Sequence, residues 1–235
     1  MASPDRRSYG QYCGTARALD VLGERWTLLV VRDLLPGPRR YGQLAAQLPG
    51  IATDILTSRL RTLEQHGLVV RRQESGVGRP VSYHLTDAGQ QLRPIIEQLA
   101  DIGARWLGAP TSSDARFDLG WALGAAAAHL HDGAVPATPL VIATSGQDYV
   151  LEPTGHRVAL RYLDDPVADA AVLVGGDEPI LGVITGHIPL AEADLAIEGD
   201  ADAVAAWIRA LTTALPASIR GDGHGLGPGD PSGAS

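Results

Sequence analysis

Residues 51–64 read IATDILTSRLRTLE, and this stretch decides the fold of the first half of the chain. Its apolar residues recur at the three- and four-residue steps of one helical face. They are Ile51, Ile55, Leu56, Leu60 and Leu63. The opposite face carries Asp54, Thr57, Ser58 and Arg61. A strong apolar stripe beside a small polar face is typical of a helix that packs on one side and offers the other to a partner.

Helical patterns precede this stretch, and strand patterns follow it. Apolar spacing predicts helices over residues 16–22, 26–35 and 41–48. Turn formers at 36–38 end the second helix, and Gly67 stops the helix of residues 51–64. Two strands are expected over residues 68–72 and 81–85. Thr86 should cap a last helix that Pro94 kinks, which makes the order helix, turn, helix and hairpin.

The motifs of this half resemble, in order, those of the HxlR family of bacterial winged-helix regulators. They are CGTARALDVLGERWTLL (13–29), GPRRY (37–41), LTSRLRTLE (56–64), GLV (67–69) and YHLT (83–86). The resemblance covers residues 9–107 and implies a dimeric DNA-binding transcription factor whose terminal helices pair. Family members often have Ser at Ala52 and a basic residue at Asp54. Thr53 is therefore expected to cap the recognition helix, and the base preference of the family does not transfer.

The second helix of a helix-turn-helix lies in the major groove, where hydroxyl and guanidinium groups reach base edges while other cations hold phosphates. Thr57, Ser58 and Arg61 are suited to bases, and the arginines outside the helix are suited to phosphates. The predicted DNA-binding residues are Arg39, Arg40, Tyr41, Thr53, Thr57, Ser58, Arg61 and Arg79. The alternative for each arginine alone is a solvated surface charge.

The last helix of this half carries apolar and small residues at three- and four-residue steps, which predicts a seam against another helix. The residues are Leu92, Ile96, Leu99, Gly103 and Trp106, and we expect them at a homodimer interface.

Cys13 precedes a helix that begins near Thr15, where backbone N–H groups and Arg17 are placed to lower its pKa and favour the thiolate. The resemblance adds that some relatives sense oxidants or electrophiles through a cysteine at this place. The alternative is a small buried core residue.

Charge is divided unevenly along the chain. Residues 1–110 hold 14 Arg against 10 acidic residues, a balance of +4, whereas residues 111–235 hold 5 against 17, a balance of −12. A basic half joined to an acidic half suggests that one part binds a polyanion.

The single cysteine excludes an internal disulfide and a multi-thiolate metal site, and no metal or cofactor is expected. A polar start and no apolar run of about 18 residues favour a cytoplasmic protein without a membrane span.

The second half changes to an alternation of strands and helices. A helix is expected over residues 117–130 and a short one over 179–185, and Asp200 should cap the last helix. The expected strands are residues 140–144, 149–152, 157–163, 170–174 and 195–198.

Three motifs make residues 169–211 similar to the sterol-carrier-protein fold: VLVGGD (172–177), GHIPL (186–190) and IEGD (197–200). The resemblance implies a pocket between a five-stranded sheet and its helices that takes an apolar small molecule. Candidate wall residues are Phe117, Trp121, Ile184, Ile188, Trp207 and Leu211. The alternative is an ordinary filled core.

The expected fold class is α+β: an N-terminal winged helix-turn-helix, mostly helical with a β-hairpin wing, and a C-terminal sterol-carrier-like α+β domain with a five-stranded sheet. The expected parts are domains at 1–107 and 114–220, a linker at 108–113 and a disordered tail at 221–235. The expected function is a homodimeric transcriptional regulator that is not an enzyme. We expect it to bind double-stranded operator DNA, to act as a repressor and to respond to an apolar effector. The alternative is a lipid carrier or enzyme that uses the winged helix only as a dimerisation scaffold.

Overall fold

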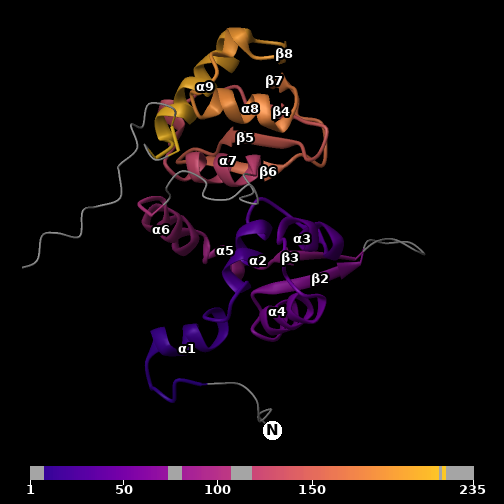
Figure 1. The fold of residues 1–235 in the computed structure, drawn as a ribbon, viewed down its shortest axis with the longest axis vertical. Helices are drawn as coiled ribbons and strands as arrows, with labels where there is room; N and C mark the ends of the chain where they lie inside the picture. Colours follow the sequence, from indigo (N-terminus) through magenta and orange to yellow (C-terminus); the bar gives the residue numbers. More distant parts are fainter. Residues whose placement is uncertain (1–7, 74–80, 107–117, 217–218, 221–235) are drawn as a thin grey trace, which may run out of the picture. The chain divides into compact units, whose positions relative to one another are not determined.

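The computed structural model describes residues 8–73, 81–106, 118–216 and 219–220. The chain, drawn as a ribbon in Figure 1, separates into two compact units, Met1–Ile96 and Glu97–Ser235. Each unit has its own hydrophobic core. The expected linker at 108–113 and tail at 221–235 lie outside the described residues.

The first unit has the predicted order of helix, turn, helix and hairpin. Its elements are α1 (Gly14–Leu22), α2 (Thr27–Leu34), β1 (Arg39–Arg40), α3 (Tyr41–Gln47), α4 (Thr53–Gln65), β2 (Val69–Gln73), β3 (Val81–Leu85) and α5 (Asp87–Gln90). The helix α6 (Arg93–Ala104) begins in this unit and continues past its boundary at Ile96. The short strand β1 was not predicted, because two residues show no periodicity. It joins the hairpin in a sheet of order β1-β3-β2, counted over the described residues.

The apolar stripe of α4 is the centre of the first core. Leu56, Leu60 and Leu63 are at most 2% exposed and pack with side chains of α2 and α3, including Leu34 and Leu44. This burial turns the polar face of α4 to solvent, as the pattern predicted.

Gly67 ends α4 in a left-handed conformation, with a φ of +67°. The N–H of Leu68 then donates to the carbonyl of Leu63 at 2.9 Å, a bond that closes the helix end. The Thr86 hydroxyl donates to the Gly67 carbonyl at 2.6 Å and also accepts from the Gly89 N–H, so Thr86 caps α5 as expected. The end of α4 is therefore tied to the start of α5.

The prediction of one kinked helix after Thr86 is wrong. The chain forms two helices, and Pro94 lies in the first turn of α6 instead of within one long helix. A proline in the first turn loses no helical hydrogen bond and meets no preceding helical carbonyl, whereas a proline inside a helix does both.

The second unit is an α+β fold whose elements agree with the predicted ones. They are α7 (Leu119–Ala128), β4 (Leu140–Ala143), β5 (Tyr149–Pro153), β6 (Val158–Tyr162), β7 (Ala171–Val174), α8 (Asp177–Ile184), β8 (Ala196–Glu198) and α9 (Ala201–Ala214), with single 3-10 turns at Asp132–Ala134 and Leu190–Glu192. Among the described residues the strands form a five-stranded sheet of order β6-β5-β4-β7-β8. β4 and β7 are parallel, and the other pairs are antiparallel.

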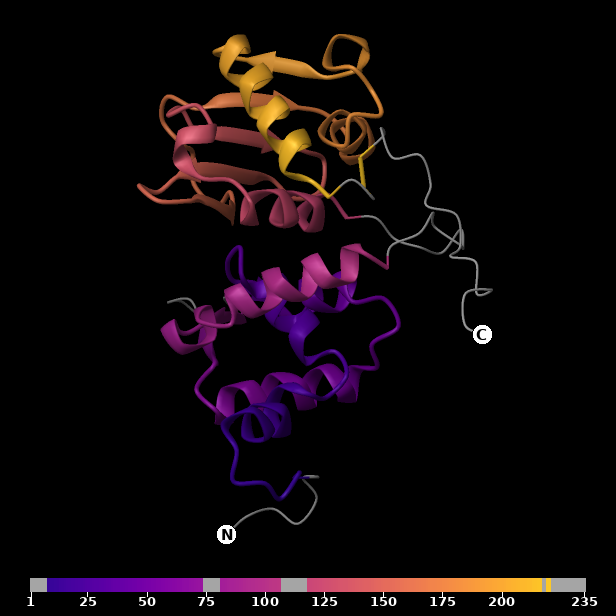
Figure 2. The same cartoon turned by 90° about the vertical axis from the view of Figure 1, so that its left-hand side faces the viewer.

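The helices of this unit pack on one sheet face, and Figure 2 shows α9 running across the strands. Trp207 of α9 is fully buried against that face, and its indole N–H donates to the Thr138 carbonyl at 2.8 Å. Asp200 caps α9 through the Ala203 N–H at 3.0 Å, and Asp118 caps α7 through the Trp121 N–H at 3.2 Å.

Candidate nucleic-acid interface

The outer face of α4 presents the side chains that the sequence predicted for it. Thr53, Asp54, Thr57, Ser58 and Arg61 are all exposed. They combine hydroxyl, carboxylate and guanidinium groups, which can bond to base edges.

The expected capping of α4 by Thr53 is wrong. Ala52 is the N-cap, with extended backbone angles of −74° and 147°, and Thr53 is already the first helical residue. The side chain of Ala52 has no polar atom, so no side chain caps α4 from this position.

Two hydroxyl groups bond to a carbonyl in the first turn of α4. Tyr41 at the start of α3 donates to the Thr53 carbonyl at 2.9 Å, and Thr57 donates to the same carbonyl at 2.8 Å. The two hydroxyl oxygens are 3.4 Å apart. Tyr41, predicted to contact DNA, therefore also holds the start of the recognition helix against α3.

Arg59 on α4 points away from this outer face. It donates through Nε to the Arg25 carbonyl at 3.2 Å and through Nη2 to the Glu24 carboxylate at 3.1 Å. Its side chain is 15% exposed. Sequence reasoning gave this residue no role, because its partners lie more than 30 positions earlier in the chain.

The register of the three-stranded sheet separates neighbouring arginines onto opposite faces. Arg39 and Tyr83 are directly paired, as are Arg40 and Ser82. Tyr83 packs against the first core, so Arg39 lies on the core side and is only 4% exposed. The prediction that Arg39 lies among exposed phosphate-binding cations is therefore wrong in this structure, whereas Arg40 is exposed.

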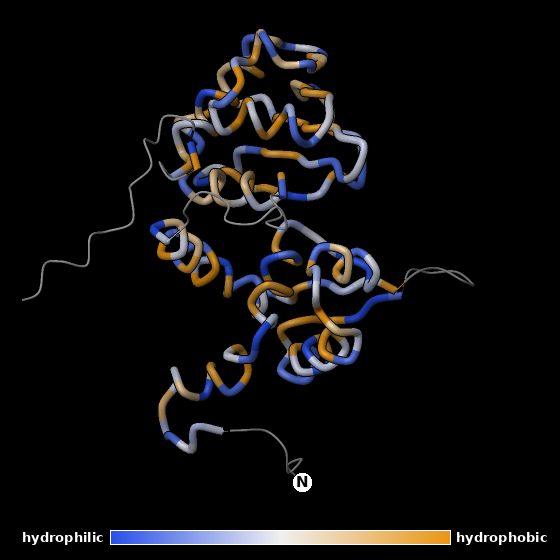
Figure 3. Tube along the Cα trace, viewed as in Figure 1, coloured by the Kyte–Doolittle hydropathy of each residue, from blue (hydrophilic) through white to orange (hydrophobic). Residues whose placement is uncertain are grey.

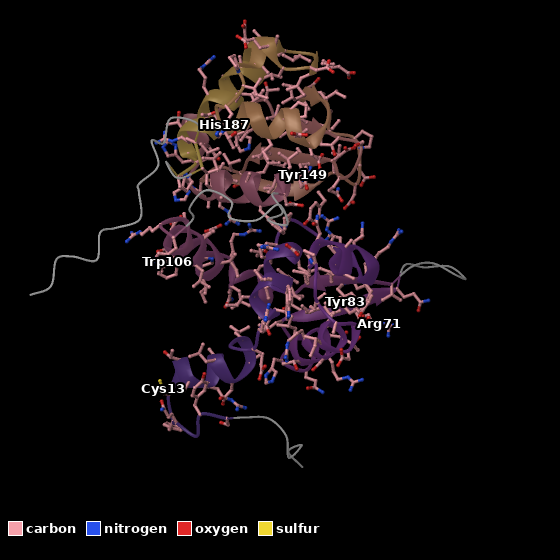
Figure 4. All side chains as sticks on the ribbon, in the orientation of Figure 1. Cys13, Arg71, Tyr83, Trp106, Tyr149 and His187 are labelled. Atoms are coloured by element: carbon pink, nitrogen blue, oxygen red, sulfur yellow. The ribbon has the colours of Figure 1, made fainter. Side chains whose placement is uncertain are left out.

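The strand β2 adds two exposed arginines that sequence reasoning missed. Arg71 and Arg72 lie at its hydrophilic end, which is blue in Figure 3. Arg72 pairs with Ser82 and so shares a sheet face with Arg40. Arg71 pairs with Tyr83, and both residues are labelled in Figure 4. Burial raises the pKa of Tyr83, and the positive charge of Arg71 opposes this shift. An adjacent pair of arginines at the end of a predicted wing strand was the available signal. Arg79 lies outside the described residues.

Cys13 is exposed at the N-cap of α1, at the edge of the unit in Figure 4. The backbone N–H groups of Ala16 and Thr15 lower the pKa of its thiol, as expected for a helix start. Arg17 is not among the groups that lower this pKa, and it lies 3.6 Å from the carboxylate of Asp20. The alternative of a buried core cysteine is wrong.

The predicted seam on α6 divides between core and surface. Leu92 is 8% exposed in the first core and Ile96 packs against that core, so these two do not belong to an exposed seam. The exposed apolar residues are Ile95, Leu99, Ile102 and Trp106, at 46%, 46%, 44% and 79%. They form a continuous stripe at three- and four-residue steps, shifted from the predicted one by part of a turn. Trp106 is labelled in Figure 4.

Several residues that were predicted to line a pocket in the second unit lie in its filled core. Ile184, Trp207 and Leu211 have no exposed surface, so no water-sized space touches them, and they are not pocket walls in this structure. Trp121 and Ile188 are half-buried, and Phe117 lies outside the described residues.

Among the described residues, no helix combines the length and the apolar character needed to cross a membrane.

The model of the HxlR-like helix-turn-helix family matches residues 21–111. An uncharacterized HTH-type transcriptional regulator of Synechocystis sp. is 39% identical over 98 residues, which are 42% of this chain and 73% of that protein. The uncharacterized HTH-type transcriptional regulator YvaP of Bacillus subtilis is 34% identical over 91 residues, 39% of this chain and 84% of its own. A solved putative transcriptional regulator from Porphyromonas gingivalis, described as of the MarR family, is 30% identical. It covers 43% of this chain and 100% of its own, with a TM-score of 0.40.

Proposed function

This chain belongs to the HxlR-like helix-turn-helix family, and we propose that it binds a pseudo-palindromic operator as a homodimer and represses transcription. Its relatives are HTH-type transcriptional regulators. Repression is the simpler outcome, because a dimer bound over a promoter blocks polymerase without any further contact.

The exposed polar face of α4 is the observation that carries this proposal. Thr57, Ser58 and Arg61 stand on one face of a helix whose other face is fixed in the core. Arg40 and Arg72 are exposed on one face of the neighbouring sheet, where cations bind phosphates without reading sequence. Base-reading groups on the helix and phosphate-binding groups beside it are the two parts that specific DNA binding needs.

The dimer is proposed from the apolar stripe of α6. Four large apolar side chains in a row on α6 and the turn after it are costly to leave in water, and a second copy of the same segment offers a matching surface. A two-fold dimer then places two copies of α4 on successive major grooves, with half-sites about 10 base pairs apart.

Selection of bound fragments from the native genome, followed by titration of the best fragment, tests this function. Arg61→Ala should weaken binding and relax the preference at one base pair, whereas Arg40→Ala should weaken binding to all sequences and reduce the salt dependence. Arg209→Ala, on the exposed side of α9, is the control with the same change of charge and should have little effect. If Arg61→Ala and Arg40→Ala both bind DNA as the parent does, the proposed interface is wrong.

For the second unit we propose a sterol-carrier-like role: binding an apolar small molecule that changes DNA affinity. The motifs of residues 169–211 and the half-buried apolar side chains of Trp121 and Ile188 support it. A useful coupling is about 5- to 150-fold in DNA affinity, and it must be reciprocal. Operator titrations with and without apolar extracts, in the parent and in Trp121→Ala, test it. Extracts that bind the parent without moving the DNA curve would leave only a carrier or a dimer brace.

Cys13 is the proposed alternative route of sensing. An exposed thiol with a lowered pKa is more readily oxidised or alkylated than an ordinary one. Peroxide should then shift operator affinity in the parent protein and not in Cys13→Ser, and equal responses would exclude this route.

A further inference from the structure

The hydrogen-bonding groups on the outer face of α4 change in kind along the helix. Acceptors lie near its start, and a donor lies further along. Asp54, in the first turn, carries an exposed carboxylate, which only accepts when ionised. The Thr57 hydroxyl is exposed and donates its proton to the Thr53 carbonyl at 2.8 Å, so toward any further partner its oxygen can only accept. Arg61, two turns after Asp54, only donates.

Few chemical groups of DNA can lie next to a carboxylate on this face of the helix. Phosphate oxygens repel it, and so do the O6 and N7 acceptors of guanine and the O4 of thymine. Amino donors in the major groove come from cytosine N4 and adenine N6. The N7 acceptor of adenine lies beside its amino group and repels a carboxylate, whereas cytosine presents its amino group without an adjacent acceptor of its own.

We propose that Asp54 reads the N4 amino group of a cytosine in the major groove, on the same face of α4 from which Arg61 reads a guanine. This inference rests on the proposed operator binding and adds to it the identity of one base and the direction of each half-site. Residues seven apart lie two helical turns from each other, about 10 Å along the axis, so the two contacts fall on different base pairs.

Tyr41 holds the reading end of the helix in place for this contact. Its hydroxyl donates to the Thr53 carbonyl at 2.9 Å, one residue before Asp54, so the turn that presents the carboxylate is anchored to α3. A base contact needs this anchoring, because a short side chain reaches its partner only from a fixed backbone.

The competing explanation is that Asp54 only stabilises α4 through the helix dipole, as acidic residues in a first turn do. Asp87 supplies the matched control, since it is also an exposed acidic residue in the first turn of a helix, α5. A dipole effect changes stability alone, whereas a base contact changes the preference at one position.

The experiment measures full-length protein on the best genomic fragment and on its complete set of single-base substitutions. The parent should prefer cytosine at one position of each half-site by roughly tenfold. Asp54→Ala should reduce this preference to near unity and leave the preferences at other positions intact. Asp54→Asn should turn it toward adenine, because an amide pairs with adenine N6 and N7. Asp87→Ala should leave every preference unchanged.

Two further outcomes would overturn the inference. A uniform rise in affinity of Asp54→Asn for all sequences, without a change of preference, places the carboxylate beside phosphates and not beside a base. A parent protein that binds no genomic fragment overturns the proposed function itself, which is a distinguishable result. Asp54→Asn keeps the size of the side chain and supplies the readout if Asp54→Ala does not fold.

Discussion

Arg59 on the recognition helix α4 and Glu24 in the turn after α1 form an ion pair of 3.1 Å. The same guanidinium donates to the Arg25 carbonyl, and the Arg25 side chain lies over the Trp26 ring at 5.1 Å. Trp26 has a φ of +79°, a left-handed conformation that costs a bulky residue energy. The recognition helix is thus bonded to the strained turn that connects α1, the helix of Cys13, with α2.

Arg59→Ala should lower the free energy of unfolding by about 1 to 3 kcal/mol, because it removes charge-assisted hydrogen bonds from a mostly buried side chain. Glu24→Ala should cost less than about 1 kcal/mol, since it removes only the half-exposed ion pair. Urea unfolding of the two variants measures the difference. Equal losses would mean that the bond to the Arg25 carbonyl contributes nothing.

Gly67→Ala should destabilise the protein by about 1 to 2 kcal/mol, because alanine is strained at a φ of +67°. A Cβ at this position meets no atom within 4 Å, so the backbone angle is the whole effect. Gly42→Ala, within α3 and equally open, is the control and should stabilise by about 0.4 to 1 kcal/mol. Thermal melts that move in the same direction for both would contradict this account.

Leu99→Asp should convert the proposed dimer to a folded monomer, because it places a charge in the exposed apolar stripe of α6. Leu92→Asp should instead unfold the first unit, since Leu92 lies in its core. Sedimentation gives the oligomeric state, and circular dichroism reports the fold. A dimer that persists in Leu99→Asp would move the interface to another surface.

Alkylation of Cys13 by iodoacetamide should have its pH midpoint lower in the folded protein than in the same chain in urea. The N–H groups of Ala16 and Thr15 stabilise the thiolate only while α1 is formed, so the pKa is lowered in the folded state alone. As Cys13 is the single cysteine, the unfolded chain is a matched reference. Coincident midpoints in the two states would remove the physical basis of thiol sensing.

Trp207→Phe should destabilise the second unit by about 1 to 3 kcal/mol, because the Thr138 carbonyl loses its 2.8 Å hydrogen bond and buried volume is lost. Ile197→Ala, on the edge strand β8 and 38% exposed, should cost much less. Similar unfolding midpoints for both variants would show that Trp207 packs less tightly than its burial indicates.

Much of the fold followed from local pattern. The stripe of α4, the stop at Gly67 and the caps Thr86 and Asp200 were predicted because helix period and capping depend on a few neighbouring residues. The Ala52 cap was missed because a polar residue next to it favoured the wrong position.

Burial at the candidate site did not follow from local pattern. Leu92 and Leu99 occupy the same predicted seam, yet the core of the first unit takes one and leaves the other exposed. Their separation depends on the break before Pro94 and on side chains far away in sequence.

The sequence by itself determined most of the helices and strands, their order, and the family to which the first half belongs, because periodicity, caps and turns depend on adjacent residues. Tertiary structure alone decided which of the neighbouring residues Arg39 and Arg40 is exposed. Their strand exists only through pairing with Ser82 and Tyr83, and the register of that pairing sends successive side chains to opposite faces. The same dependence on distant partners placed Arg59 with Glu24, so that cation is held inside the fold while Arg61 remains open to a partner.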